Sequence, residues 1–456
     1  MRRSLAVLFA GLAMPALAAP FTLLPVSHPA LAAVERYEVS APALAYRGAD
    51  AAAFAGSLPL AVGSALSFKG YEKGSAALEF WAVTDRGPNA DSPEVLNGGT
   101  RYASKLFPVP AFVPTVVQLR VSLAEAATVG RMLPLREAGR AISGLPLPQG
   151  AVGASGEIGL DEKLQPLPYD TLGFDPEGIA ADKQGNLWLV DEYGPFLARV
   201  DAASGEIRQR YAPGSGLPAI LAARQPNRGF EGVTVTPSGK VVAIVQSTLD
   251  VDGRTRHGAR FSRIVELDPA SGTVRQFGYP VPAHYNKAGD MKLGDIVALS
   301  DSRFAVIEQG KDQDKRMHND ITLIDLATAT ALDGKTLADG RALEYGDDAM
   351  LAAAGIQLAR RTLALDLRAL GWTAEKAEGL TLVENNQLAL INDNDFGVRS
   401  EVQGSAAKLA QLQVAAGQLQ NLAGQRQDGV RVAIAPNREA TELWLITLQK
   451  PLHALP

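Results

Sequence analysis

The chain has 456 residues, of which 46% are hydrophobic and 20% charged, an ordinary balance for a protein with a large buried core. A formal net charge of −5, without a cluster of Lys and Arg between aromatic residues, argues against a nucleic-acid partner. The absence of cysteine excludes disulfides, thiolate metal sites and cysteine nucleophiles, and 44 Gly with 28 Pro favour short strands and turns over helices.

The beginning of the chain predicts an export signal over residues 1–19. Arg2-Arg3 is followed by an apolar stretch over residues 5–17 and by the small-residue cleavage motif Ala16-Leu17-Ala18. A membrane anchor is disfavoured because prolines interrupt the apolar run well short of the roughly 20 residues that a span requires. We therefore expect a periplasmic or secreted protein without a membrane span, cut near residue 19 or at the second motif Ala30-Leu31-Ala32.

An internal repeat is the most informative pattern along the chain. Two apolar runs begin eight positions apart with a polar turn between them, at 179–187, 233–241, 296–304 and 380–388. The turns contain the Gly, Asn, Asp and Ser that β-hairpins need. The second run ends at a polar residue and is continuously apolar, as in a strand buried on both faces. Runs at 80–83 and 443–446 look like a fifth and a sixth copy.

Radial repetition of three or four antiparallel strands predicts an all-β fold, a β-propeller of about six blades over residues 34–456. Residues 35–39 are expected to complete the last blade beside the final strand and to close the ring. The irregular spacing predicts insertions near 122–148 and 347–370, each a helical or loop excursion, and near 401–428, an Ala/Gln-rich helical or mobile outer excursion.

Three repeats carry a Glu-Gly pair directly before the opening apolar residue, with the glutamates at Glu177, Glu231 and Glu378. The first strand of every blade lines the central axis, so these carboxylates should converge on one funnel. Converging carboxylates raise one another's pKa unless a cation neutralises them, which indicates a Ca²⁺ site. Capping of each blade by hydrogen bonds from its own Glu is an equally good explanation.

Acidic loops follow three of the buried strands and should open on one face. They begin at Thr84, Asp191 and Asn392, and their candidate metal ligands are Asp85, Asp191, Glu192, Asp393 and Asp395. Arg86, in the first loop, is suited to bind a phosphate or carboxylate. Ordinary Asx-turn chemistry explains any one of these loops, whereas three at equivalent strand ends favour a shared site.

Basic residues near the repeats offer an anion site. They are Lys376, Arg228, Arg260, Arg263 and His257, and each either binds an anion or pairs with a carboxylate of the funnel. Only five His are present, without metal-ligand spacing, so a zinc centre is disfavoured. The chain has no Gly-x-Ser-x-Gly elbow, phosphate loop or dinucleotide fingerprint.

Several of these motifs together resemble exported phytase-like proteins of bacteria, described as the "esterase-like activity of phytase" family. The resemblance is carried by Asp175-Pro176-Glu177-Gly178-Ile179, Asp191-Glu192-Tyr193-Gly194-Pro195, Asn227-Arg228-Gly229-Phe230-Glu231-Gly232, Lys376-Ala377-Glu378-Gly379-Leu380, Asn392-Asp393-Asn394-Asp395-Phe396-Gly397 and Thr84-Asp85-Arg86-Gly87-Pro88-Asn89. It implies a propeller, export and calcium-assisted hydrolysis of phosphoric or other esters. The chain departs from the acidic pattern at Gly294-Asp295, and Glu308-Gln309-Gly310 lacks the basic residue expected beside the acid.

The leading hypothesis is a metal-dependent phosphoesterase that acts at the funnel. Ions held by Glu177, Glu231, Glu378, Asp85 and Asp393 would polarise the ester and activate water, and Arg86 with Lys376 would orient the anion. A non-catalytic propeller that binds a small molecule, glycan or protein is the alternative from another class, and a lactonase-type hydrolase is the third. We expect a small anionic substrate and a monomer.

Overall fold

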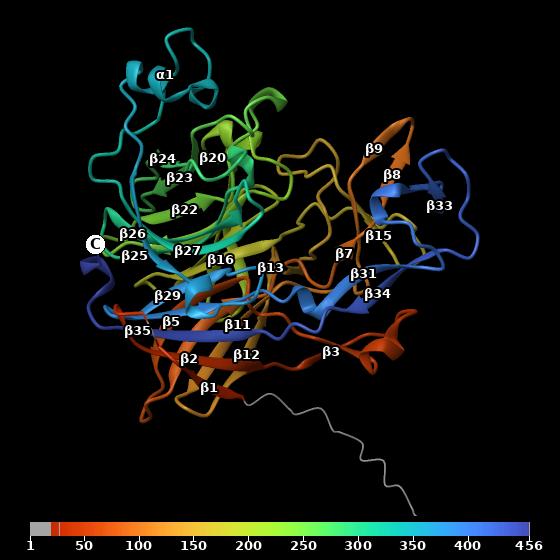
Figure 1. Cartoon of the computed structure of the whole chain (residues 1–456), viewed down its shortest axis with the longest axis horizontal. Helices are drawn as coiled ribbons and strands as arrows, with labels where there is room; N and C mark the ends of the chain where they lie inside the picture. Colours follow the sequence, from red (N-terminus) through yellow and green to blue (C-terminus); the bar gives the residue numbers. More distant parts are fainter. Residues whose placement is uncertain (1–19, 27, 456) are drawn as a thin grey trace, which may run out of the picture.

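The computed structural model describes residues 20–26 and 28–455, so the predicted export signal lies outside the described residues. The chain is a β-propeller, as predicted, and it is nearly all strand (Figure 1). No helix within 20–26 and 28–455 has the length and apolar character needed to cross a membrane. The described residues contain one α-helix, α1 (Asp348–Ala353), which lies outside the blades.

The described residues form five blades of four antiparallel strands. The first contains β5 (Ala65–Tyr71), β6 (Leu78–Val83), β11 (Thr115–Ser122) and β12 (Ala126–Pro134). The second contains β16 (Pro176–Ala181), β17 (Asn186–Asp191), β18 (Phe196–Asp201) and β19 (Glu206–Pro213). The third contains β21 (Phe230–Val235), β22 (Val241–Val245), β23 (Phe261–Leu267) and β24 (Val274–Pro280). The fourth contains β25 (Lys292–Ala298), β26 (Arg303–Lys311), β27 (Met317–Asp325) and β28 (Arg360–Asp366).

The fifth blade draws its strands from both ends of the described chain. It contains β29 (Gly379–Glu384), β30 (Gln387–Ile391), β35 (Glu442–Leu448) and β2 (Leu31–Ser40), with β1 (Phe21–Leu24) paired to β2. β2 runs antiparallel to β35, with Glu35 opposite Leu445, which confirms the predicted closure of the ring. The blade count is therefore one lower than the six apolar runs suggested. The runs at 388–391 and 443–446 are β30 and β35, neighbours in this one blade.

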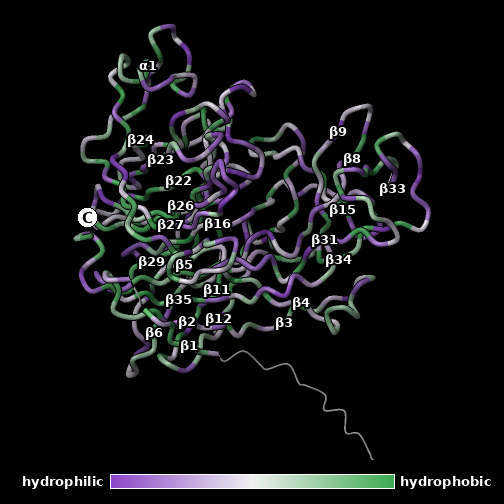
Figure 2. The backbone as a smooth tube through the Cα atoms, viewed as in Figure 1, coloured by the Kyte–Doolittle hydropathy of each residue, from purple (hydrophilic) through white to green (hydrophobic). Residues whose placement is uncertain are grey.

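Five hydrophobic clusters fill the five gaps between neighbouring blades. Along β17, Leu187 and Leu189 pack toward the first blade, whereas Trp188 and Val190 pack toward the third. Successive side chains of a strand point to opposite faces, so a strand between two neighbours must be apolar at every position. This explains the continuous runs in the sequence, and Figure 2 shows hydrophobic residues concentrated along the blade strands.

The segments expected to be helical excursions are mostly strand. Residues 122–148 contain β12 together with the short β13 (Arg136–Glu137) and β14 (Arg140–Ala141), so the helical interpretation is wrong there. β12 is the outermost strand of its blade, and a strand at that place does not need a continuous apolar run. Residues 347–370 contain α1 but also β28, again an outermost strand.

The segment 401–428 belongs to a second layer of small sheets beside the blades, at the right of Figure 1. Its sheets pair β31 (Val398–Gln403) with β34 (Arg431–Pro436), and β32 (Leu412–Ala415) with β33 (Gln418–Asn421) and β8 (Glu94–Asn97). The layer also holds β9 (Thr100–Tyr102), β7 (Ala90–Asp91), β10 (Ser104–Leu106), β15 (Ile158–Leu160), β3 (Ala43–Ala45) and β4 (Ser57–Pro59). The short β20 (Gly216–Leu217) lies beside β19. The prediction of a helix at 401–428 is therefore wrong.

The inner strands β5, β16, β21, β25 and β29 approach one another closely around the axis. A Cβ on Gly232 would lie 2.6 Å from the Cα of Asp295, and one on Gly379 would lie 2.7 Å from the backbone nitrogen of Leu66. Asp295 occupies the same repeat position as these glycines and is 1% exposed. Its carboxylate accepts backbone N–H bonds from Ile296 at 2.9 Å and Leu380 at 3.1 Å. Asp295, the acid that breaks the Glu-Gly pattern, thus joins neighbouring inner strands at the centre of the ring, which we call the hub.

Candidate functional site

The three glutamates of the Glu-Gly pairs lie at equivalent places at the start of inner strands. In β16, Pro176 pairs with Asp191 and Gly178 with Val190, so Glu177 is the extra residue of a β-bulge. Glu231 occupies the same place in β21, and Glu378 directly precedes β29. A bulge redirects the side chain of the extra residue, and here it accounts for carboxylates at the mouth of the funnel. The structure therefore brings together the three predicted glutamates.

An acidic cluster lies on one side of the funnel. Carboxylate oxygens of Asp175, Glu177 and Glu192 lie within 4.8 Å of one another. Glu231 is 4% exposed, and its Oε2 is buried without a hydrogen-bond partner among the described residues. Gln246 donates from Nε2 to Glu192 at 3.2 Å. Carboxylate oxygens gathered in this way are the type of donor that a hard cation such as Ca²⁺ prefers.

The pKa values of the cluster reflect the cost of this crowding. Burial, reinforced by Asp175, raises the pKa of Glu192 to about 8. Burial also raises the pKa of Glu177 well above its usual range, with further increases from Asp175 and Glu231. The pKa of Glu231 rises for the same reasons, burial first and then Glu378. Without a cation, these acids hold protons that a bound metal would displace.

Arg86 is committed to carboxylates of its own protein. Its Nη1 donates to Glu157 at 2.9 Å and to the Tyr193 hydroxyl at 3.1 Å, and its Nε lies 3.4 Å from Asp175 Oδ2. Its backbone N–H donates to Asp175 Oδ1 at 2.9 Å, and the side chain is 7% exposed. The predicted anion-binding role does not match this arrangement, since the guanidinium is engaged. Arg86 instead positions Asp175 at the acidic cluster.

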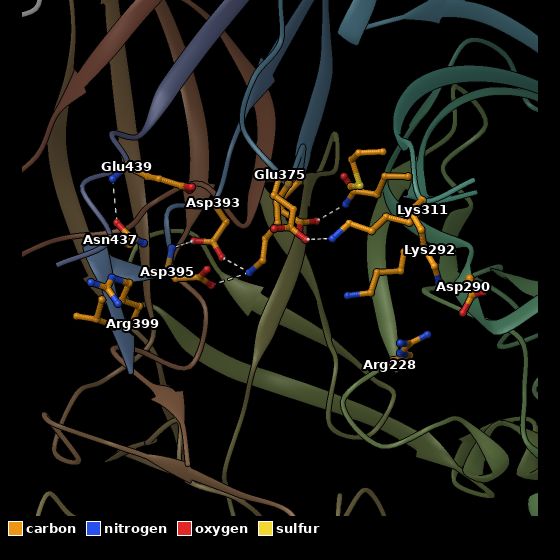
Figure 3. A pocket seen from close by; sticks show the side chains of 17 residues that line it. Arg228, Asp290, Lys292, Lys311, Glu375, Asp393, Asp395, Arg399, Asn437 and Glu439 are labelled. Atoms are coloured by element: carbon orange, nitrogen blue, oxygen red, sulfur yellow. Dashed lines mark hydrogen bonds and ion pairs between the residues drawn. The ribbon is translucent and has the colours of Figure 1, made fainter. Parts of the chain in front are cut away.

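Lys376 and the loop after β30 form a second charged group. Its ammonium donates to Asp393 at 2.9 Å and to Asp395 at 2.6 Å, as Figure 3 shows. Burial raises the pKa of Asp395, but Lys376 outweighs it and the pKa is lowered. Lys376 is therefore also engaged in ion pairs, and it neutralises two of the predicted metal ligands. Glu378 lies nearby, and burial raises its pKa to about 7 against the opposing effect of Lys376.

Two further predicted ligands differ in their placement. One oxygen of Asp191 accepts from the backbone N–H of Gly194 in its own loop at 2.6 Å, and the other accepts from the N–H of Asp175, just before β16, at 2.7 Å. The residue is fully buried. The Gly194 contact matches the Asx-turn alternative, whereas the Asp175 contact joins two separate segments. Asp85 accepts from the Gly87 N–H at 2.7 Å, yet it lines a cavity together with Glu177.

The other basic residues divide between the funnel and the outside. Arg228 lines the funnel, where its Nη1 donates to the Ser247 hydroxyl at 3.2 Å. Arg263 pairs with the buried Glu344 at 2.7 Å, away from the funnel cavities. Arg260 pairs with Asp348 at 3.5 Å, and His257 contacts Arg256. Of the basic residues predicted for the anion site, only Arg228 and Lys376 therefore line the funnel.

Two adjoining cavities form the funnel, of about 480 and 450 Å³. The larger is lined by Arg228, Glu378, Met317 and Gln309, the smaller by the acidic cluster with Asp85 and Arg86. Lys292, Lys376, Asp393, Asp395, Val398 and Arg399 line both. The wall that carries Val398 and Arg399 is β31, so the second layer of sheets closes one side of the mouth.

Lys292 and Asp175 also line the funnel, and neither was among the predicted site residues, although the repeat register contained the signal. Lys376 stands two positions before Glu378, and Asp175 two before Glu177. Lys292 stands two before Gly294, the position that replaces Glu in the fourth repeat. Aligning all repeats at that position would have placed both residues at the funnel.

A comparison with known protein families agrees with the motifs found in the sequence. A family model described as "Phytase-like: Esterase-like activity of phytase" matches residues 64–396. An uncharacterized secreted protein of Arthroderma benhamiae is 27% identical over 133 residues, covering 23% of this chain and 26% of that protein. The match thus spans about a quarter of that relative's length.

Two solved structures align with most of this chain at low sequence identity. Virginiamycin B lyase from Staphylococcus aureus is 10% identical over 84% of this chain and 94% of that chain, with a TM-score of 0.25. The catalytic domain of Coprinopsis cinerea GH62 alpha-L-arabinofuranosidase is 9% identical over 92% of this chain and 98% of that chain, with a TM-score of 0.35.

Proposed function

Because this chain belongs to the phytase-like family, we propose that it is an exported, metal-dependent hydrolase of phosphoric esters that acts at the mouth of the propeller funnel. The predicted signal at residues 1–19 and the secreted relative support export. The observation that carries the proposal is the acidic cluster of Asp175, Glu177 and Glu192, beside the buried, unpartnered oxygen of Glu231.

The residues present fit a calcium ion at this cluster. All the candidate donors are carboxylate oxygens, and their pKa values are raised first by burial and then by the neighbouring carboxylates, an effect that a bound cation would oppose. When bound, Ca²⁺ would supply the positive charge that polarises a phosphoryl oxygen and lowers the pKa of a coordinated water.

The surrounding side chains hold this donor set in place. Arg86 fixes Asp175 through both its backbone N–H and its guanidinium, and Gln246 orients Glu192. Such support matters because a site loses activity when its ligands move by about 1 Å. Most of these supporting groups are buried, so they exclude water from one side of the cluster.

Glu378 is suited to move a proton in the reaction. Its pKa of about 7 allows both protonation states at neutral pH, which is the property that general acid–base catalysis uses. It lines the larger cavity, close enough to Gln309 for its Oε2 to lie 3.5 Å from the amide nitrogen. We assign to Glu378 the transfer of a proton to the leaving group.

Hydrolysis assays on the purified protein test the proposal. The protein stripped with a chelator is assayed with p-nitrophenyl phosphate, p-nitrophenyl acetate and a lactone panel, with and without added CaCl₂. We expect calcium-dependent release from the phosphate ester, lost in Glu177→Gln and retained in Glu125→Gln, a matched change at an exposed acid on the outer hairpin of the first blade. Calcium-induced thermal stabilisation without turnover would support the binding propeller instead, and turnover of lactones alone would support the lactonase. Lack of any turnover would remove the enzyme hypothesis.

A further inference from the structure

Lys292 is a cation of the funnel that is not committed to any partner. Lys376 holds Asp393 and Asp395, and Arg86 holds Glu157 and Asp175. The ammonium of Lys292, in contrast, has no hydrogen bond or ion pair within 4.0 Å to the residues that the structure describes. Figure 3 shows its side chain extending into the cavity without an interaction to the residues drawn.

The position of Lys292 is fixed by the hub. It is the first residue of β25 and pairs across the hairpin with Gln309, so its backbone belongs to the rigid part of the blade. Its side chain lines both cavities, at the junction between the acidic cluster and the larger cavity. Burial raises the pKa of Glu192, Glu231 and Glu378, and the charge of Lys292 acts against that rise, which places the ammonium among these acids.

A lysine whose role was only to neutralise the acids would contact them directly, as Lys376 contacts Asp393 at 2.9 Å. The three N–H donors of the Lys292 ammonium are therefore free to bind another acceptor. Arg228 stands beside it on the larger cavity and has no carboxylate within ion-pair distance in the part of the chain described here. Among the basic residues of the described funnel lining, Lys292, Arg228 and Lys315 lack a carboxylate partner. Of these three, Lys315 is exposed to solvent, whereas Lys292 and Arg228 are partly buried.

We propose that Lys292, assisted by Arg228, binds the anionic group of the substrate at the junction of the two cavities. This inference rests on the proposed hydrolase function and gives the anion-orienting role to residues other than Arg86 and Lys376. An anion held there faces the acidic cluster, and any metal bound to it, on one side. The larger cavity on the other side, with Met317 and Val398 in its lining, has room for the leaving group of the ester.

Binding of inorganic phosphate tests the inference separately from hydrolysis. Phosphate is titrated calorimetrically into the wild-type protein, Lys292→Met and Lys335→Met, with CaCl₂ below the solubility limit of calcium phosphate. Lys335 is an exposed lysine outside the funnel and serves as the matched control. We expect the Kd for phosphate to rise at least about tenfold in Lys292→Met, the loss of one charge-assisted contact, and to stay unchanged in Lys335→Met. Lys292→Arg should retain most of the affinity, because it keeps the charge.

Calcium binding, followed by thermal unfolding, reports separately on the acidic cluster. It should persist in Lys292→Met, which also shows that the variant is folded. Phosphate affinity equal to wild type in Lys292→Met, or phosphate binding undetectable in the wild type, overturns the inference. If phosphate binds through Lys292 but no ester is hydrolysed, the inference stands and the proposed hydrolase function fails. If the ester is hydrolysed and Lys292→Met leaves KM unchanged, the function stands and the inference fails.

Discussion

Replacement of Asp295 by Ala should destabilise the whole ring, because one carboxylate joins several inner strands. The side chain is 1% exposed and accepts the backbone N–H groups of Ile296 at 2.9 Å and Leu380 at 3.1 Å. Water cannot reach these donors, and a buried unsatisfied donor costs about 1–3 kcal/mol. The two donors together predict a loss of about 2–6 kcal/mol in the free energy of unfolding.

Equilibrium unfolding in urea measures this loss as a lower midpoint at similar slope. Asp268→Ala is the matched control, since the Asp268 carboxylate accepts turn N–H bonds at an exposed site where water can replace it. Asp295→Asn should fall between wild type and Asp295→Ala, because the carboxamide keeps one acceptor oxygen but turns an NH₂ group toward the donors. A midpoint for Asp295→Ala equal to that of Asp268→Ala would refute the idea that the carboxylate holds the hub together.

Three more outcomes follow from the same geometry. Folding raises the pKa of Glu192 from 4.5 to about 8. The free energy of unfolding of the metal-free protein should therefore fall as pH rises between those values, by up to about 1.4 kcal/mol per pH unit for one proton. In thermal unfolding, the increase in Tm on adding calcium should accordingly be larger at pH 8 than at pH 5.5. Arg86→Met leaves Asp175 unpaired, and we expect about 3–5 kcal/mol of destabilisation in urea and a weakened calcium effect on Tm. Gly232→Ala puts a Cβ 2.6 Å from the next inner strand and should cost about 1–3 kcal/mol, whereas Gly258→Ala, with open space around it, should not.

The fold was predictable because each blade repeats one local pattern. The eight-residue spacing within 179–187 and its three copies predicted the inner hairpins. In the structure, the apolar runs are strands that pack on both faces. The count of blades was not predictable from the runs alone. β30 and β35 are separated in sequence by the second layer of sheets yet lie side by side in one blade, and pairing between strands that far apart leaves no local signal.

Outer strands escaped prediction for a related physical reason. β12 and β28 lie at the outside of their blades, where part of each strand faces solvent and polar residues are tolerated. Because buried and exposed positions do not alternate regularly along these strands, the spacing of their hydrophobic residues resembles that of loops or short helices. The second layer likewise consists of strands of two to six residues, too short for periodicity to identify.

The sequence predicted the acidic residues of the candidate site better than its basic residues. Glu177, Glu231 and Glu378 were identified because they share a repeat position, and the fold places equivalent positions around one axis. The sequence does not reveal which basic side chains form ion pairs, because their acidic partners lie far away in the chain. Arg86 meets Glu157 and Asp175 only after the first two blades assemble.

The register of the repeats also explains how a ring of similar blades obtains a directional site. The position two residues before the Glu of the pair is Asp175 in the second blade, Gly229 in the third and Lys376 in the fifth. In the fourth blade, where Gly294 replaces the Glu, the same position is Lys292. Around the axis this position therefore changes from an acid, through a residue without a side chain, to two lysines. A cation is favoured at the acidic end and an anion at the basic end, and both ends line the smaller cavity of the same funnel. A small set of substitutions at one repeat position thus converts a pseudosymmetric hub into a surface suited to a metal and a phosphoryl group together.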